Sequence, residues 1–110
     1  MKNPPKHLSR QTKAWWKTVA EGHYLEEWQY RTLTSACEAW DRGVQAREQI
    51  DAEGLTITDR FGQSKAHPLL AVERDCRIAF LRAVRELALE VDGPASSPPS
   101  ARPPRIRAVQ

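Results

Sequence analysis

The spacing of hydrophobic residues changes twice along this chain. In residues 9–21 and 26–53, apolar residues recur every three or four positions, which is the spacing of one face of a helix. Residues 55–58 instead alternate apolar and polar side chains, as a strand does. The helical spacing then returns in residues 68–91. The pattern predicts a mainly all-α fold, in which a short N-terminal helix precedes a long antiparallel helical hairpin with a small β-hairpin between the long helices.

Residues with strong positional preferences stand at the expected ends of these helices. Ser9 is a good N-cap for the first helix, and Gly22 and Gly54 are natural stops for the first and second. Pro68 suits the first position of the last helix, because that position needs no N–H donor. His67 then occupies the cap position, so we expect its ring to cap the helix or to pack nearby, over Trp40 or Phe61.

The β-hairpin is expected over residues 54–66. Asp59 and Gly62 are the first and fourth residues of a four-residue turn, which both residue types favour. A single hairpin is marginally stable in water. We therefore expect it to pack against the helices or against another subunit.

Residues 26–53 carry two apolar stripes. One contains the larger side chains Leu33, Cys37, Trp40 and Val44, and the other contains Ala36, Ala39, Gly43, Ala46 and then Ile50. Small side chains let another helix approach closely, which would offset the cost of about 1 kcal/mol of a helical glycine. The alternative is that Gly43 only marks a kink.

The first helix should pack across the two long ones. Its adjacent Trp15 and Trp16 cannot share a face, so one should enter the core and the other should face a neighbouring chain or the tail.

The last helix is apolar over more than one face, and only about seventy to eighty residues are available for a core, a size at which self-association is common. A homo-oligomer is the simplest explanation. The candidate interface residues are Ala36, Ala39, Gly43, Ala46, Ile78 and Leu81.

Composition divides the chain into residues 1–8, a basic N-terminal arm, residues 9–91, the helical oligomerisation core, and residues 92–110, a Pro/Arg-rich tail expected to be disordered. The net charge of +3 conceals basic ends and an acidic middle: residues 1–20 hold five bases and no acid, whereas residues 21–53 hold eight acids and three bases. Basic arms suit phosphate backbones, although they can also be merely solvated. The candidate DNA-binding residues are Lys2, Lys6, Arg10, Lys13, Lys17, Arg102, Arg105 and Arg107.

Arginines also line the last helix, where the spacing of Glu73 to Arg77 and of Arg82 to Glu86 suits helical ion pairs. Either these charges neutralise one another on a solvated face or the arginines face DNA. The full set comprises Arg74, Arg77, Arg82 and Arg85.

No motif for catalysis is recognisable. The chain has no G-x-x-x-x-G-K-[ST] phosphate loop, and His67 has no acidic partner in its sequence neighbourhood. The histidines and cysteines lack zinc-site spacing, so Cys37 and Cys76 are expected to be buried free thiols in a reducing cytosol. No run approaches the roughly 18 apolar residues of a membrane span, and no signal peptide is recognisable. We expect a non-enzymatic protein without catalytic residues, cofactor, metal or membrane partner.

The order of these features, over about residues 8–89, resembles the small subunits of tailed-phage terminases. Ala88 stands where that family usually has glycine, Pro94 and Arg102 come late, and Glu26 and Glu27 stand near the place of a usual aspartate. The matching features are Trp16, then Leu33, Cys37 and Trp40, then Gly54 with Leu55, then Gly62, then Lys65 with His67 and Pro68, and finally Glu86, Leu87 and Leu89.

The resemblance implies a homo-oligomeric ring in the cytoplasm of the bacterial host. Such a ring binds double-stranded viral DNA and recruits and regulates the large terminase subunit, an ATPase and nuclease, during genome packaging. Two alternatives are a small DNA-binding transcriptional regulator and an adaptor that binds only protein. A regulator would need a recognition helix, and the helix after the turn at Gly22 opens with Glu26 and Glu27, which repel phosphate.

Overall fold

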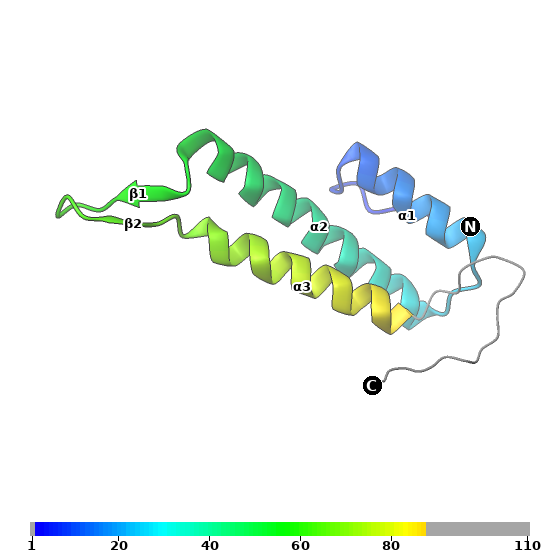
Figure 1. Ribbon diagram of the computed structural model, residues 1–110. Coiled ribbons are helices and arrows are strands. Elements are labelled where there is room, and N and C mark those ends of the chain that lie inside the picture. The colour runs from blue at the N-terminus through cyan, green and yellow to red at the C-terminus, as the bar shows by residue number, and fades with distance from the viewer. Residues whose placement is uncertain (1, 88–110) are drawn as a thin grey trace, which may run out of the picture.

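A computed structural model describes residues 2–87. The described residues form three helices and one two-stranded antiparallel sheet (Figure 1). This confirms the mainly helical fold and the predicted order of its elements. The elements are α1 (Arg10–Gly22), α2 (Glu27–Glu53), β1 (Thr56–Thr58), β2 (Ser64–Ala66) and α3 (Leu69–Leu87). The expected extension of the last helix to Val91 and the tail of residues 92–110 lie outside the described residues.

Helices α2 and α3 lie side by side and antiparallel, and α1 lies along the first half of α2 (Figure 1). The hairpin projects beyond the far end of the α2–α3 pair. Within it, Thr56 pairs with Ala66 and Thr58 pairs with Ser64. Leu55 and Phe61 of the hairpin remain exposed, so these side chains do not pack against the helices, which was one of the two expected arrangements. Packing of the hairpin against another subunit stays a prediction.

The beginning of α1, the end of α2 and the hairpin turn lie where the sequence predicts them. The Oγ of Ser9 accepts a hydrogen bond from the backbone N–H of Thr12 at 3.3 Å. The N–H of Gly54, whose φ is 95°, donates to the carbonyl of Ile50 at 2.6 Å and ends α2. In the turn, the N–H of Gly62 donates to the carbonyl of Asp59 at 3.0 Å. The capping signals thus decide where the chain enters and leaves its helices.

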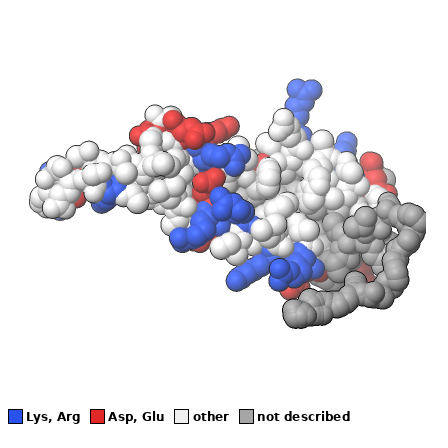
Figure 2. All heavy atoms as spheres, in the orientation of Figure 1, with Lys and Arg blue, Asp and Glu red and all other residues white. Residues whose placement is uncertain are grey.

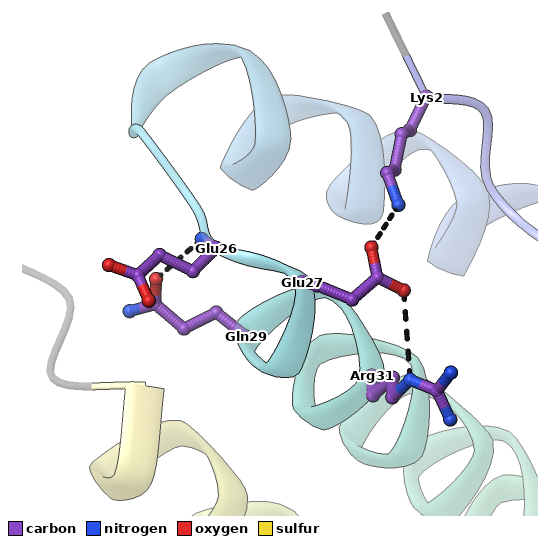
Figure 3. Close-up of polar contacts among 5 residues, drawn as sticks. All are labelled: Lys2, Glu26, Glu27, Gln29 and Arg31. Atoms are coloured by element: carbon purple, nitrogen blue, oxygen red, sulfur yellow. Dashed lines mark hydrogen bonds and ion pairs between the residues drawn. The ribbon is translucent and has the colours of Figure 1, made fainter.

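The beginning of α2 is capped by Glu26 and Gln29, which face each other across the first turn (Figure 3). The backbone N–H of Glu26 donates to the Oε1 of Gln29 at 2.8 Å, and the carboxylate of Glu26 accepts in return from the Gln29 backbone. This reciprocal capping box satisfies two otherwise free N–H groups. Acidic residues at this end also complement the helix dipole.

The core lies where α1 meets α2 and the end of α3. Trp16 is buried there, and its Nε1–H donates to the Oγ1 of Thr34 at 3.2 Å. The pKa of the Cys37 thiol is raised to about 12, mainly by burial and further by the nearby charges of Asp41 and Glu38. Cys76 is only half-buried, which corrects the expectation for that thiol. The core side chains are Leu8, Trp16, Val19, Leu25, Leu33, Cys37 and Leu87.

The stripe of small residues on α2 packs against α3 of the same chain. Ala36 and Ala46 are buried, and a Cβ added at Gly43 would lie 3.4 Å from the Cβ of Cys76 on α3. The helix that approaches this stripe closely is therefore α3 of the same chain. A contact of Ala36, Ala39, Gly43 or Ala46 with a second copy remains a prediction, as does the contact of Ile78 and Leu81, which are exposed on α3.

Candidate nucleic-acid interface

Basic side chains line one face of α1 and the segment before it. Lys6, Arg10, Lys13 and Lys17 follow one another at intervals of four, three and four residues, so the three within α1 share a helix face. The buried side chains of α1 occupy a different face, which fixes the helix on the core; they are Thr12, Trp16 and Val19. The amphipathic pattern of α1 therefore turns its bases toward solvent.

These four bases surround one open hollow. Asn3, Pro4 and Ala14 complete its lining. None of the four basic side chains forms an ion pair with a carboxylate of residues 2–87. An acid-free cluster of this kind can neutralise several phosphates of a nucleic-acid backbone without reading its bases. The structure thus brings together four of the five bases predicted near the N-terminus: Lys6, Arg10, Lys13 and Lys17.

The fifth base, Lys2, lies elsewhere. Its Nζ contacts the carboxylate of Glu27 and lies 4.8 Å from the centre of the Tyr30 ring. Figure 3 shows Glu27 between Lys2 and Arg31, whose Nε lies 3.6 Å away. The hydrogen bond from Lys2 is the main reason that the pKa of Glu27 is lowered. The charge of Lys2 is matched by an acid 25 positions away in the sequence, which no local pattern indicates.

Asp41 of α2 holds the beginning of α1. It accepts hydrogen bonds from the N–H of Ser9 at 2.7 Å, from the Oγ of Ser9 at 2.9 Å and from the Oγ1 of Thr12 at 2.6 Å. Burial raises its pKa, but these hydrogen bonds outweigh burial, so the pKa of Asp41 lies below its ordinary value. Because the first turn of α1 contains no acid, Asp41 supplies from α2 the negative charge that this helix end favours. It thereby positions the basic face.

The arginines of α3 are only partly neutralised. Figure 2 shows Lys and Arg side chains gathered over α3, and Asp and Glu side chains over the end of α2. Arg77 lies 3.7 Å from the carboxylate of Glu73, which confirms the predicted helical pair, and Arg47 of α2 reaches the same carboxylate at 3.6 Å. Arg82 and Arg85 form no ion pair with residues 2–87, so the predicted Arg82–Glu86 pair is absent from this part of the chain.

Three further bases predicted to bind DNA, Arg102, Arg105 and Arg107, lie outside the described residues. Of the six interface candidates, Ile78 and Leu81 are 41% and 56% exposed on α3. They remain accessible to another chain.

His67 is the cap predicted from the sequence. Its Nδ1 accepts a hydrogen bond from the backbone N–H of Leu69 at 3.1 Å. Its Nε2 lies 2.6 Å from the Oε1 of Glu53, an acidic partner that the sequence spacing did not reveal. Because Nδ1 accepts, the ring proton sits on Nε2 and is donated to Glu53. His67 therefore bonds to Glu53 instead of packing over Trp40 or Phe61, the latter being 75% exposed.

Within the described residues, no group of three His, Cys, Asp or Glu side chains is arranged to hold a metal ion. Across residues 2–87, no helix combines the length and the apolar character needed to cross a membrane.

Fold and site together define a small helical-hairpin protein with a basic face on its first helix. A family model described as the small subunit of phage terminase matches residues 12–95, and the chain belongs to that family. Neither the curated proteins nor the solved structures compared with the chain gave a match.

Proposed function

We propose that the protein is the non-catalytic subunit of a phage packaging terminase, acting as an oligomeric ring that binds double-stranded viral DNA. Membership of the small-subunit family supports this role. The DNA-binding part of it is carried by the cluster of four bases on and just before α1, which form no ion pair within residues 2–87. The ring recruits and regulates the large terminase subunit, which supplies the ATPase and nuclease. It acts in the cytoplasm of the bacterial host and needs no cofactor.

The α1 face suits binding that depends on charge. Lysine and arginine side chains that contact phosphates release condensed counterions, so the logarithm of the binding constant falls linearly with the logarithm of salt concentration. Arg102, Arg105 and Arg107 are proposed as additional contacts, since phosphate binding requires only positive charge within reach. Such contacts position the duplex and provide little sequence readout.

Assembly is proposed to use the exposed apolar positions of α3. Ile78 and Leu81 are large apolar side chains exposed on α3, and covering them would remove apolar area from water. The stripe of smaller side chains on α2 is already packed against α3, so Ile78 and Leu81 are the more accessible part of the proposed interface.

The proposal is tested by changing Lys6, Arg10, Lys13 and Lys17 to glutamine, singly and together, and measuring binding to duplex DNA at several salt concentrations. Each lost phosphate contact should lower the slope of the log–log plot by roughly one unit. Lys2→Gln is the matched control, because Lys2 is already paired with Glu27. An unchanged slope in the fourfold variant would contradict the assignment of this face, and a lowered slope in an Arg74, Arg77, Arg82 and Arg85 variant would move the site to α3.

A further inference from the structure

Three aromatic side chains from the three helices form a cradle. The rings of Trp40 on α2 and Phe80 on α3 are 4.9 Å apart between centroids, and those of Trp15 on α1 and Phe80 are 5.8 Å apart. Gln11 and Thr12 complete the lining of the hollow between them. The hollow is therefore apolar, with a few hydrogen-bonding groups at its edge.

The cradle is open within the described part of the chain. Trp40 is 49% exposed, whereas the neighbouring Trp16 is only 2% exposed. Of the adjacent tryptophans, Trp16 enters the core, as expected for one of the two, whereas Trp15 is partly buried against the core and faces Phe80 of the same chain. The expected contact of the second tryptophan with a neighbouring chain or the tail remains a prediction. Large aromatic surfaces left open beside polar groups are characteristic of binding sites.

We propose that residues 94–110 of this same chain bind in the aromatic cradle. The segment contains five prolines and three arginines and no acidic residue. Proline-rich segments bind aromatic-lined grooves because their extended conformation loses little entropy on binding. Arginine adds favourable contacts with tryptophan faces. Both abundant residue types of the segment therefore match the chemistry of the cradle.

The cradle is within reach of this segment. Seven helical positions separate Phe80 from Leu87, the last described residue, which corresponds to roughly 10 Å along the helix axis. Eleven residues lead from Leu87 to the proline pair Pro98 and Pro99, and a chain of that length can span up to about 35 Å. The connection is long enough to turn back along α3.

Charge also favours this occupant. The hollow that adjoins Trp40 on α2 is lined by three carboxylates and two arginines. Glu48 forms no ion pair with any of residues 2–87, so it is available to a cation. Arginines of the acid-free segment supply that cation. The carboxylates are Glu38, Asp41 and Glu48, and the arginines are Arg10 and Arg42.

Fluorine NMR of the full chain labelled with 5-fluorotryptophan tests the proposal. Four alanines replacing Pro98, Pro99, Pro103 and Pro104 should shift the Trp15 and Trp40 resonances. Trp16 and Trp28 serve as internal controls and should not move, because Trp16 is fixed in the core and Trp28 lies outside the cradle. Four unmoved resonances would overturn the proposal, and so would equal shifts of all four, which indicate a global change.

Other occupants give different results in the same experiment. If a second copy fills the cradle, the Trp15 and Trp40 resonances will depend on protein concentration and ignore the proline changes. If nucleic-acid bases fill it, single-stranded DNA will move them in both the wild type and the proline variant. Either outcome overturns docking of residues 94–110.

Limited trypsin digestion of full-length Trp40→Ala gives a second test. Loss of this half-exposed ring should free the segment, so cleavage after Arg105 and Arg107 should become several-fold faster than in the wild type. Trp28→Ala, which removes a tryptophan of similar exposure outside the cradle, should leave the rate unchanged. Equal cleavage rates in the wild type and Trp40→Ala would overturn the proposal. Because no DNA is present, these outcomes are independent of the proposed DNA-binding function.

Discussion

The Nε2 of His67 lies 2.6 Å from the Oε1 of Glu53, so the residue that caps α3 is bonded to the last residue of α2. The backbone N–H of His67 also donates to the carbonyl of Leu55 at 2.8 Å. These bonds join the two chain segments at the base of the hairpin. They fix where the projecting hairpin leaves the helices, although its tip has no described packing partner.

Replacing His67 with alanine should lower the free energy of unfolding by about 1 kcal/mol, the usual loss for an N-cap. His67→Asn retains a side chain that can accept the Leu69 N–H, so its effect should be smaller. Urea unfolding of both variants measures the difference. DNA binding per assembled ring should be unchanged; a stable His67→Ala variant that fails to bind DNA would show that His67 is a contact residue.

Replacing Asp41 with asparagine should destabilise the attachment of α1 to α2. The substitution removes the charged acceptor of three hydrogen bonds, and bonds to charged groups contribute about 1.5–3 kcal/mol. The expected loss is about 1–3 kcal/mol because the amide oxygen still accepts. Chemical unfolding measures it. Glu38→Gln is a suitable control, since within residues 2–87 the one hydrogen-bond partner of the Glu38 side chain is the exposed His7. Equal losses in the two variants would contradict the special role of Asp41.

Stability should fall in acid partly through Asp41. Its pKa is below the ordinary value in the folded chain, so the folded state binds this proton less readily than the unfolded state. The contribution of Asp41 is therefore complete above an ordinary aspartate pKa of about 3.9 and is lost as the pH falls through the lower folded value. Unfolding free energies measured across this range should vary less steeply in Asp41→Asn than in the wild type. Parallel curves would rule out this contribution.

Substitutions at Gly43 should distinguish close helix packing from a simple kink. An alanine Cβ would lie 3.4 Å from the Cβ of Cys76, an ordinary contact, so Gly43→Ala should be neutral or stabilising by up to about 1 kcal/mol. Gly43→Leu should instead force α2 and α3 apart and cost about 1–3 kcal/mol. Thermal unfolding of the two variants compares them. A leucine as well tolerated as alanine would contradict close packing at this position.

Replacing Ile78 and Leu81 with serine should reduce the mass of the assembly measured by light scattering. Both side chains are exposed in the single chain, and burying a side chain of this kind contributes about 1.5–3 kcal/mol. Helix content should be unchanged, because neither residue belongs to the core. Leu55→Ser, at an exposed site on the hairpin, is the matched control. If only Leu55→Ser lowers the mass, the contact between copies lies at the hairpin.

Much of the fold was predictable because its signals are local. Helical spacing, the cap at Ser9, the glycine at Gly54 and the turn from Asp59 to Gly62 depend on residues only a few positions apart. His67 was predicted as a cap for the same reason. The shared basic face of Arg10, Lys13 and Lys17 also follows from helical periodicity once the boundaries of α1 are known.

Local patterns in the sequence therefore specify the order of elements, their ends and the chemical character of each face. Which faces meet is settled by folding, because that depends on contacts between residues far apart in the chain. Folding paired Lys2 with Glu27 and thereby separated Lys2 from the other bases. It placed Asp41 at the beginning of α1, and it brought Trp15, Trp40 and Phe80 from three helices into one cradle. Local propensity cannot specify such pairings, since they arise when separate apolar faces are buried together.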